Sequence, residues 1–138
     1  MSLAIVYTRA ALGIEAPLIT VEVHLSNGLP GLTMVGLPET TVKEARDRVR
    51  SALINSGYAF PAKKITINLA PADLPKEGGR YDLPIALALL VASEQLNTTR
   101  LNQYEFVGEL ALTGGLRGVP GAIPSAMEAI KAGRRIVV

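Results

Sequence analysis

The sequence predicts an α+β domain in which helices pack on a β-sheet. The first third of the chain is rich in β-branched and aliphatic residues interrupted by Gly and Pro, as consecutive strands are. Beyond residue 40, helix-like and strand-like segments alternate. Strands followed by such an alternation are typical of a two-layer α+β sandwich with the helices on one face of the sheet. With 138 residues, the chain has the length of one domain.

Strands are expected wherever short apolar runs lie between turn residues. Three strands joined by hairpins come first, over residues 3–9, 14–25 and 32–35. In the second, apolar and polar residues alternate from Val21 to Leu25, which indicates one buried face. Later strands are expected over residues 63–69 and 106–112, with a short return strand at 116–119.

Helices are expected over residues 41–56, 81–95 and 122–132. In the first, Thr41 and Glu44 have the spacing of a capping box, and Gly57 follows where a left-handed residue ends a helix. The second is apolar nearly all round, so we expect it to be buried, with Ile85 and Leu89 in the core. A last strand is expected to begin at residue 134, as in a fragment of a longer protein.

The composition excludes several kinds of site. There is no cysteine for a disulfide or a thiolate metal site, and His24 is a lone histidine, too few for a His-rich zinc site. The longest apolar run, residues 83–92, is too short to cross a bilayer. The N-terminus does not read as a secretory signal, so we expect a cytoplasmic protein with no membrane partner. The Walker pattern Gly-x-x-x-x-Gly-Lys-Ser/Thr is missing, so this chain is not expected to bind ATP.

The most informative segment is the loop Pro71-Ala-Asp-Leu-Pro-Lys-Glu-Gly-Gly-Arg-Tyr-Asp-Leu-Pro84, between an expected strand and an expected helix. Such loops commonly carry the functional groups of α/β domains. The segment resembles the loop of Lon-type proteolytic domains, and more closely that of the magnesium-chelatase-like AAA+ proteins of the ComM/YifB family. The second resemblance extends over essentially the whole chain and includes Ser26-Asn-Gly-Leu-Pro-Gly31 and Val35-Gly-Leu-Pro-Glu-Thr-Thr-Val-Lys-Glu-Ala45.

This resemblance implies that residues 1–138 form a single N-terminal domain with the fold of ribosomal protein S5 domain 2 and the Lon proteolytic domain. It also implies a hexameric AAA+ parent protein that uses ATP and magnesium, with its ATPase module beyond residue 138. The resemblance further implies that the parent protein is a motor that drives branch migration of DNA during natural transformation. The partners implied are therefore DNA and other subunits of the same protein in a ring.

Peptidase activity is the alternative that the Lon resemblance raises. Lon-type enzymes use a serine in Gly-Pro-Ser-Ala-Gly and a later lysine, and matching the segments places Asp82 and Pro124 at these positions. A carboxylate cannot replace the nucleophilic hydroxyl, and proline has no amine to act as base. Ser125 and Lys131 lie nearby but do not match the motif. We therefore expect no catalytic, cofactor or metal site in this chain, and a peptidase with an unrecognised nucleophile stays the alternative.

The charged residues leave two further interpretations open. Asp73, Glu77 and Asp82 could ligate magnesium, but basic residues between them favour salt bridges instead.

The candidate DNA-binding residues are Lys43, Arg46 and Arg50 on one edge of the first expected helix, with Lys76 and Arg80 in the loop. The net charge of +2 is mild, so it permits contact with nucleic acid without demanding it. The alternatives are that these charges only solvate the helix, or that the domain assembles subunits without touching DNA.

Overall fold

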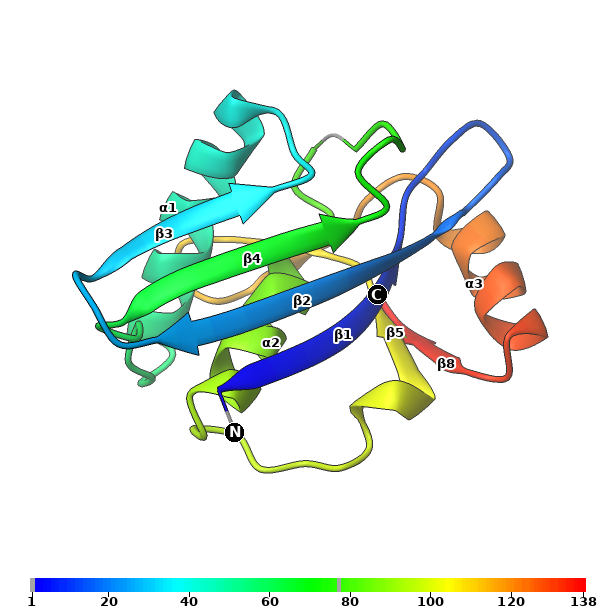
Figure 1. Cartoon of the computed structure of the whole chain (residues 1–138). Helices are drawn as coiled ribbons and strands as arrows, with labels where there is room; N and C mark the ends of the chain where they lie inside the picture. The colour runs from blue at the N-terminus through cyan, green and yellow to red at the C-terminus, as the bar shows by residue number, and fades with distance from the viewer. Residues whose placement is uncertain (1, 77) are drawn as a thin grey trace.

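The computed structural model describes residues 2–76 and 78–138, and a six-stranded mixed sheet forms its centre (Figure 1). The strands lie in the order β3 (Gly31–Val35), β4 (Lys64–Ala70), β2 (Leu18–Ser26), β1 (Leu3–Arg9), β5 (Tyr104–Phe106) and β8 (Arg135–Val137). Strand β2 is antiparallel to both of its neighbours, and the other three pairs are parallel. Strands β6 (Glu109–Leu110) and β7 (Leu116–Arg117) form a separate small hairpin.

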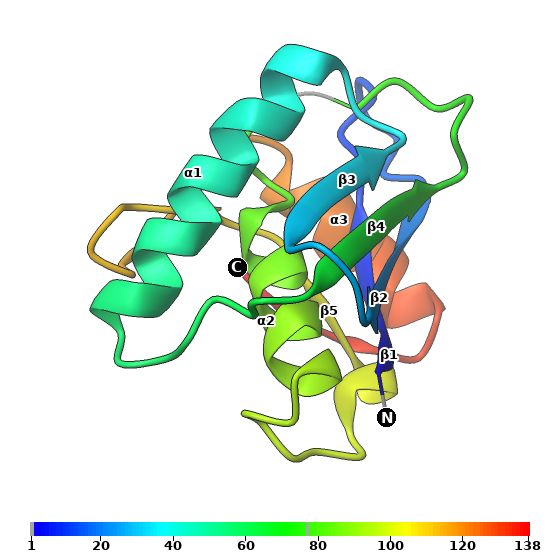
Figure 2. The same ribbon diagram turned by 60° about the vertical axis from the view of Figure 1, so that its left-hand side comes forward.

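Helices α1 (Glu39–Asn55) and α2 (Asp82–Ala92) cover one face of the sheet, as Figure 2 shows from the side. Helix α2 packs on β1 and β2, and α1 packs on α2. The short 3-10 helix η1 (Leu101–Gln103) precedes β5. No helix among the described residues is long and apolar enough to span a bilayer.

Helix α3 (Ala122–Lys131) does not join this helical layer. Because side chains alternate along a strand, Arg9 projects from the face of β1 opposite to Val6, which lies in the core. Arg9 donates a hydrogen bond of 3.3 Å to the carbonyl of Glu128 in α3. The α+β class is therefore confirmed, but the prediction that all helices lie on one face holds only for α1 and α2.

The expected series of three hairpin-linked strands is wrong at its third member. Strand β4 lies between β2 and β3, and β3 pairs with β4 in parallel, with Gly31 opposite Lys64. Strand β4 buries alternate apolar residues, whereas β3 buries only Met34, which suits an edge position. In Figure 1, β3 and β4 lie in front of α1, so the β3–α1–β4 crossover is left-handed, which is uncommon.

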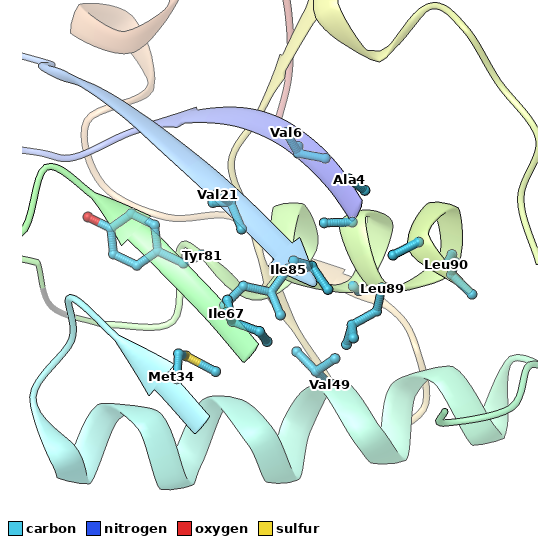
Figure 3. Close-up of a cluster of buried hydrophobic side chains, with 14 of the residues drawn as sticks. Ala4, Val6, Val21, Met34, Val49, Ile67, Tyr81, Ile85, Leu89 and Leu90 are labelled. Atoms are coloured by element: carbon cyan, nitrogen blue, oxygen red, sulfur yellow. The ribbon is translucent and has the colours of Figure 1, made fainter. Parts of the chain in front are cut away.

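The core lies between the sheet and the two helices (Figure 3). Val21 and Ile67 from adjacent strands meet Ile85 and Leu89 from α2 and Val49 from α1, and each is at most 1% exposed. Burying a side chain of this size contributes about 1.5–3 kcal/mol. The prediction that the 81–95 helix is a core element with Ile85 and Leu89 inside is confirmed.

The ends of α1 show which local signals were informative. The predicted capping box is wrong, because Thr41 and Glu44 lie inside the helix, which begins after Pro38 without a side-chain cap. Gly57 has the predicted positive φ of 88°. The N–H of Tyr58 then bonds to the carbonyl of Leu53 at 2.9 Å, which closes the helix in a Schellman motif.

Replacing Ile85 or Leu89 with Ala should lower the free energy of unfolding by about 2–5 kcal/mol, because a cavity would remain between α2 and the sheet. Ile54→Ala in α1 is the matched control, since Ile54 is 50% exposed; it should change stability by less than about 0.5 kcal/mol. Urea unfolding followed by circular dichroism measures all three. Equal stability of the two core variants and the parent would contradict this packing.

Candidate functional site: the polar cluster around the 71–84 loop

The 71–84 loop joins β4 to α2, and backbone hydrogen bonds fix its second half. Gly108 N–H donates to the carbonyl of Arg80, and Leu83 N–H donates to the carbonyl of Gly108, both at 3.0 Å. Gly108 lies between β5 and β6, so the strand predicted over residues 106–112 is interrupted where these two bonds form. A Cβ on Gly79 would lie 2.3 Å from the carboxylate of Glu109, so any larger residue there would displace the Glu109 side chain. The loop is thus held against the β5–β6 connection.

Asp82, which the Lon resemblance matches to the nucleophilic serine, forms a buried ion pair. Arg48 in α1 donates to both carboxylate oxygens, at 2.6 and 3.3 Å, and Leu110 N–H donates at 3.1 Å. Burial raises the pKa of Asp82 above its ordinary value, and the hydrogen bond from Arg48 opposes this shift most strongly. The same bond raises the pKa of Arg48. Asp82 therefore joins α1, α2 and β6 as an anchoring group.

Arg80 is the second polar centre, and it is 5% exposed. Its guanidinium donates to the carbonyl of Arg9 at 2.9 Å, to the carbonyl of Pro120 at 2.7 Å and to Ser125 Oγ at 3.3 Å. All three acceptors are neutral, and burial lowers the pKa of Arg80. Arg80 therefore connects the loop to the end of β1 and to the start of α3.

Lys76 is buried as well, with 3% of its surface exposed. Its ammonium group donates to the carbonyl of Pro71 and to that of Leu74, the second at 3.1 Å. Burial lowers the pKa of Lys76, and nearby Asp73 partly opposes that shift. Lys76 thus closes the loop upon itself.

The structure separates the five candidate DNA-binding residues into two groups. Lys76 and Arg80 face inward and donate to backbone carbonyls. Lys43, Arg46 and Arg50 lie together on the outer side of α1, where Lys43 and Arg50 are exposed and Arg46 is half-buried. The edge predicted on the first helix therefore exists, but the loop residues do not extend it.

Sequence reasoning missed a buried ion triad at the other end of the sheet. Glu105 in β5 is fully buried and accepts hydrogen bonds from Arg9 at 2.6 and 2.9 Å and from Arg134 at 3.1 Å. Arg134 also lies 4.0 Å from the ring centroid of Tyr7. The one local signal was a glutamate inside an otherwise apolar strand, since its partners are distant in sequence.

The residues considered for peptidase chemistry are engaged elsewhere. Ser125 is fully buried and accepts from Arg80, while Lys131 pairs with Glu128 at 3.1 Å on the exposed side of α3. Ser125 and Lys131 are therefore not partners of one another. Pro124, at the position of the Lon-type lysine, lies in the first turn of α3.

A metal site finds no support in the arrangement of the loop carboxylates. Asp82 is bonded to Arg48, Asp73 is exposed, and Glu77 lies outside the described residues. Within residues 2–76 and 78–138, no group of three or more His, Cys, Asp or Glu side chains is placed to hold a metal ion.

A cavity of about 490 Å³ lies between the 71–84 loop and residues 118–120. Its polar side chains are those of Arg80, Tyr81 and Glu109, and Gly and Pro residues form most of the remaining wall. In the described part of this wall there is no Ser, Cys, His or Lys. The described wall of the cavity therefore supplies one guanidinium and one carboxylate, but no Ser, Cys or Lys nucleophile beside a base.

The model of the family described as subunit ChlI of Mg-chelatase matches residues 21–138, from β2 to the end of the chain. Because this match covers most of the chain, the chain belongs to that family.

Within it, the chain is 83% identical to Uncharacterized protein YifB of Salmonella typhimurium and 82% identical to Uncharacterized protein YifB of Escherichia coli. It is 66% identical to Competence protein ComM of Haemophilus influenzae. Each match covers 100% of this chain and 27% of the relative. The resemblance to the ComM/YifB family is confirmed, while the likeness to ribosomal protein S5 and Lon domains stays a prediction.

The ion pair between Arg48 of α1 and Asp82 can be tested with the variant Arg48→Met. This variant leaves the buried Asp82 carboxylate without its cation, so it should lose about 3 kcal/mol of unfolding free energy at neutral pH. The double variant Arg48→Met/Asp82→Leu removes both charges and should lose less. Arg46→Met is the control, because Arg46 makes only an exposed 3.7 Å pair with Asp47; its effect should be below about 1 kcal/mol.

The sign of the pH dependence follows from the raised pKa of Asp82. The folded Arg48→Met variant binds a proton more readily than its unfolded chain does, so its stability should rise, relative to the parent, as pH falls from about 7 to about 5. Urea titrations at both pH values measure this. A deficit that stays constant or grows on acidification would contradict the buried, unpaired carboxylate.

Proposed function

We propose that this chain is the non-catalytic N-terminal domain of a cytoplasmic, ComM-like hexameric AAA+ ATPase that branch-migrates DNA during natural transformation. The observation that carries the proposal is the 66% identity to Competence protein ComM over all 138 residues. In this proposal ATP and magnesium bind to a different part of the protein. The domain contributes a DNA contact, and neighbouring subunits in the ring are its other partners.

The outer edge of α1 supports the DNA contact. Ala45 and Val49 bury the inner side of α1, which leaves Lys43, Arg46 and Arg50 on its outer side. Lys43 is exposed, and none of the ion pairs between described residues includes it, so its charge is available to a phosphate. Lysines and arginines on one helix edge suit contacts to the DNA backbone, which are independent of base sequence.

The fixed geometry of α1 favours this edge over the loop. The guanidinium of Arg50 lies over the ring of Phe60, 5.9 Å from its centroid. The ion pair between Arg48 and Asp82 attaches α1 to the start of α2. Lys76 and Arg80 shape the loop in this proposal, because their N–H groups already donate to carbonyls. With a net charge of +2, one domain binds weakly, and several domains in a ring supply avidity.

The non-catalytic part of the proposal predicts that the chain leaves unfolded casein intact, with and without ATP. The support is that Asp82 is bound to Arg48 and that Ser125 is fully buried. Gel electrophoresis after prolonged incubation measures this, with active protease as the positive control. Cleavage that disappears in a Ser125→Ala variant of unchanged stability would establish the peptidase alternative.

The DNA contact predicts sequence-independent binding that weakens with salt. Replacing Lys43, Arg46 and Arg50 together with Gln should flatten the log–log salt slope for duplex DNA by about 0.9 for each lost phosphate contact. Fluorescence anisotropy on single-stranded, duplex and branched DNA at several salt concentrations measures the slope. The matched control replaces the exposed residues Arg117, Lys131 and Arg135 with Gln and should keep the parent slope.

Three outcomes separate the alternatives. If the salt slope is unchanged in the α1 variant and reduced in the control variant, the DNA-contacting surface does not lie on α1. Equal slopes in all three proteins would also contradict the α1 edge. If the unmodified chain shows no salt-sensitive binding to any DNA form at high micromolar concentration, the domain that only assembles subunits is favoured.

A further inference from the structure

Helix α3 carries an apolar stripe that nothing in the described chain covers. Ile123, Met127 and Ile130 recur at the helical spacing that places residues on one face, and they are 75%, 56% and 72% exposed. The opposite side of the helix is occupied, since Ser125 and Ala129 are fully buried. The helix is therefore packed on one side and exposes a second apolar side.

A groove of about 440 Å³ adjoins this stripe. It lies between α3 and the connection from β1 to β2, and Ile14, Pro17, Pro124 and Met127 contribute apolar wall. Ile14 is 91% exposed, so a bulky apolar side chain projects from a loop next to the stripe. Neighbouring exposed apolar groups of this kind mark interaction surfaces more often than isolated ones do.

A second, independent feature lies beside the stripe. Strand β8 follows α3 directly, packs against it, and is the last strand of the sheet, so one of its backbone edges has no partner strand in the described part of the chain. Val137, the last residue of β8, is 38% exposed, and Val138 after it is 53% exposed. An unpaired edge with apolar side chains is ready to accept another strand.

The size of the surface selects the kind of occupant. Stable interfaces between separate proteins take about 20–30 residues from each partner, many more than one helix stripe and a three-residue strand supply. A tethered segment needs far less area, because a linker keeps it at about millimolar effective concentration. The relatives contain such material, since this chain matches only 27% of their length.

We propose that the stripe of α3 and the free edge of β8 form one intramolecular docking surface in full-length members of the family. An additional β-strand from elsewhere in the same polypeptide pairs with β8, and an apolar side of that segment covers Ile123, Met127 and Ile130. The surface thereby joins this domain rigidly to the remainder of the protein. This inference is independent of the proposed DNA contact on α1, and it is tested separately.

The test compares this chain alone with a chimera in which it replaces the matched segment of the Escherichia coli relative, to which it is 82% identical. The chain has no cysteine, so Met127→Cys introduces a single thiol into it. Labelling at this position, followed by peptide mass spectrometry, should be slower in the chimera by about tenfold or more, because protected groups react only after local opening. Asp47→Cys on exposed α1 is the control and should be labelled equally fast in both proteins.

Hydrogen exchange gives a second reading of the same samples. Backbone amides of residues 134–138 should exchange more slowly in the chimera, because an added strand protects the β8 edge. Equal labelling and equal exchange in the two proteins would overturn the proposal. Protection in the isolated chain that grows with its concentration would also overturn it, because a second copy would then be the occupant.

Discussion

The burial of α2 on two sides is the constraint on which the rest of the structure depends. Ile85, Ala88 and Leu89 are each at most 1% exposed, because the sheet covers one side of the helix and α1 covers another. Asp82 at the start of the helix and Arg80 just before it are buried as well, and each is satisfied by groups from other elements. The polar cluster is thus a consequence of the apolar core.

The same burial closes off Asp82, the residue that the Lon resemblance matches to a nucleophile. A nucleophile must have an open side from which a substrate approaches, and a base within hydrogen-bonding distance. The carboxylate of Asp82 instead accepts from Arg48 and from Leu110 N–H, and the side chain is 1% exposed. Asp82 therefore has a structural role, while the exposed basic edge lies on α1 and the exposed apolar stripe lies on α3.

Local structure was predictable from the sequence because it depends on neighbouring residues. The alternation in β2, the all-apolar α2 and the positive φ of Gly57 were each visible in a short window. Pairing between distant strands was not visible, so the insertion of β4 between β2 and β3 and the position of α3 were missed. Periodicity reports which face of an element is buried, but not which element covers it.

The residues of the candidate site were likewise predictable where they depend on local spacing, and not where they depend on distant groups. That Lys43, Arg46 and Arg50 share a helix edge follows from helical spacing alone. The fate of Lys76 and Arg80 depends on carbonyls presented by Pro71, Arg9 and Pro120, and no sequence pattern indicates that backbone oxygens will accept from a given cation. The two cations of this Gly- and Pro-rich loop were interpreted as candidates for phosphate contacts, whereas the folded loop turns Lys76 and Arg80 inward.

The Glu105 triad ties two segments that are distant in sequence to one strand of the sheet. Arg9 in β1 and Arg134, three residues beyond α3, share one fully buried carboxylate in β5. Separating the end of α3 from the sheet would leave that carboxylate partly uncompensated in a medium of low polarity, which is costly. The segment that follows α3 is therefore held to β1 and β5 through one carboxylate, so detaching it from the sheet costs more than the loss of its apolar contacts.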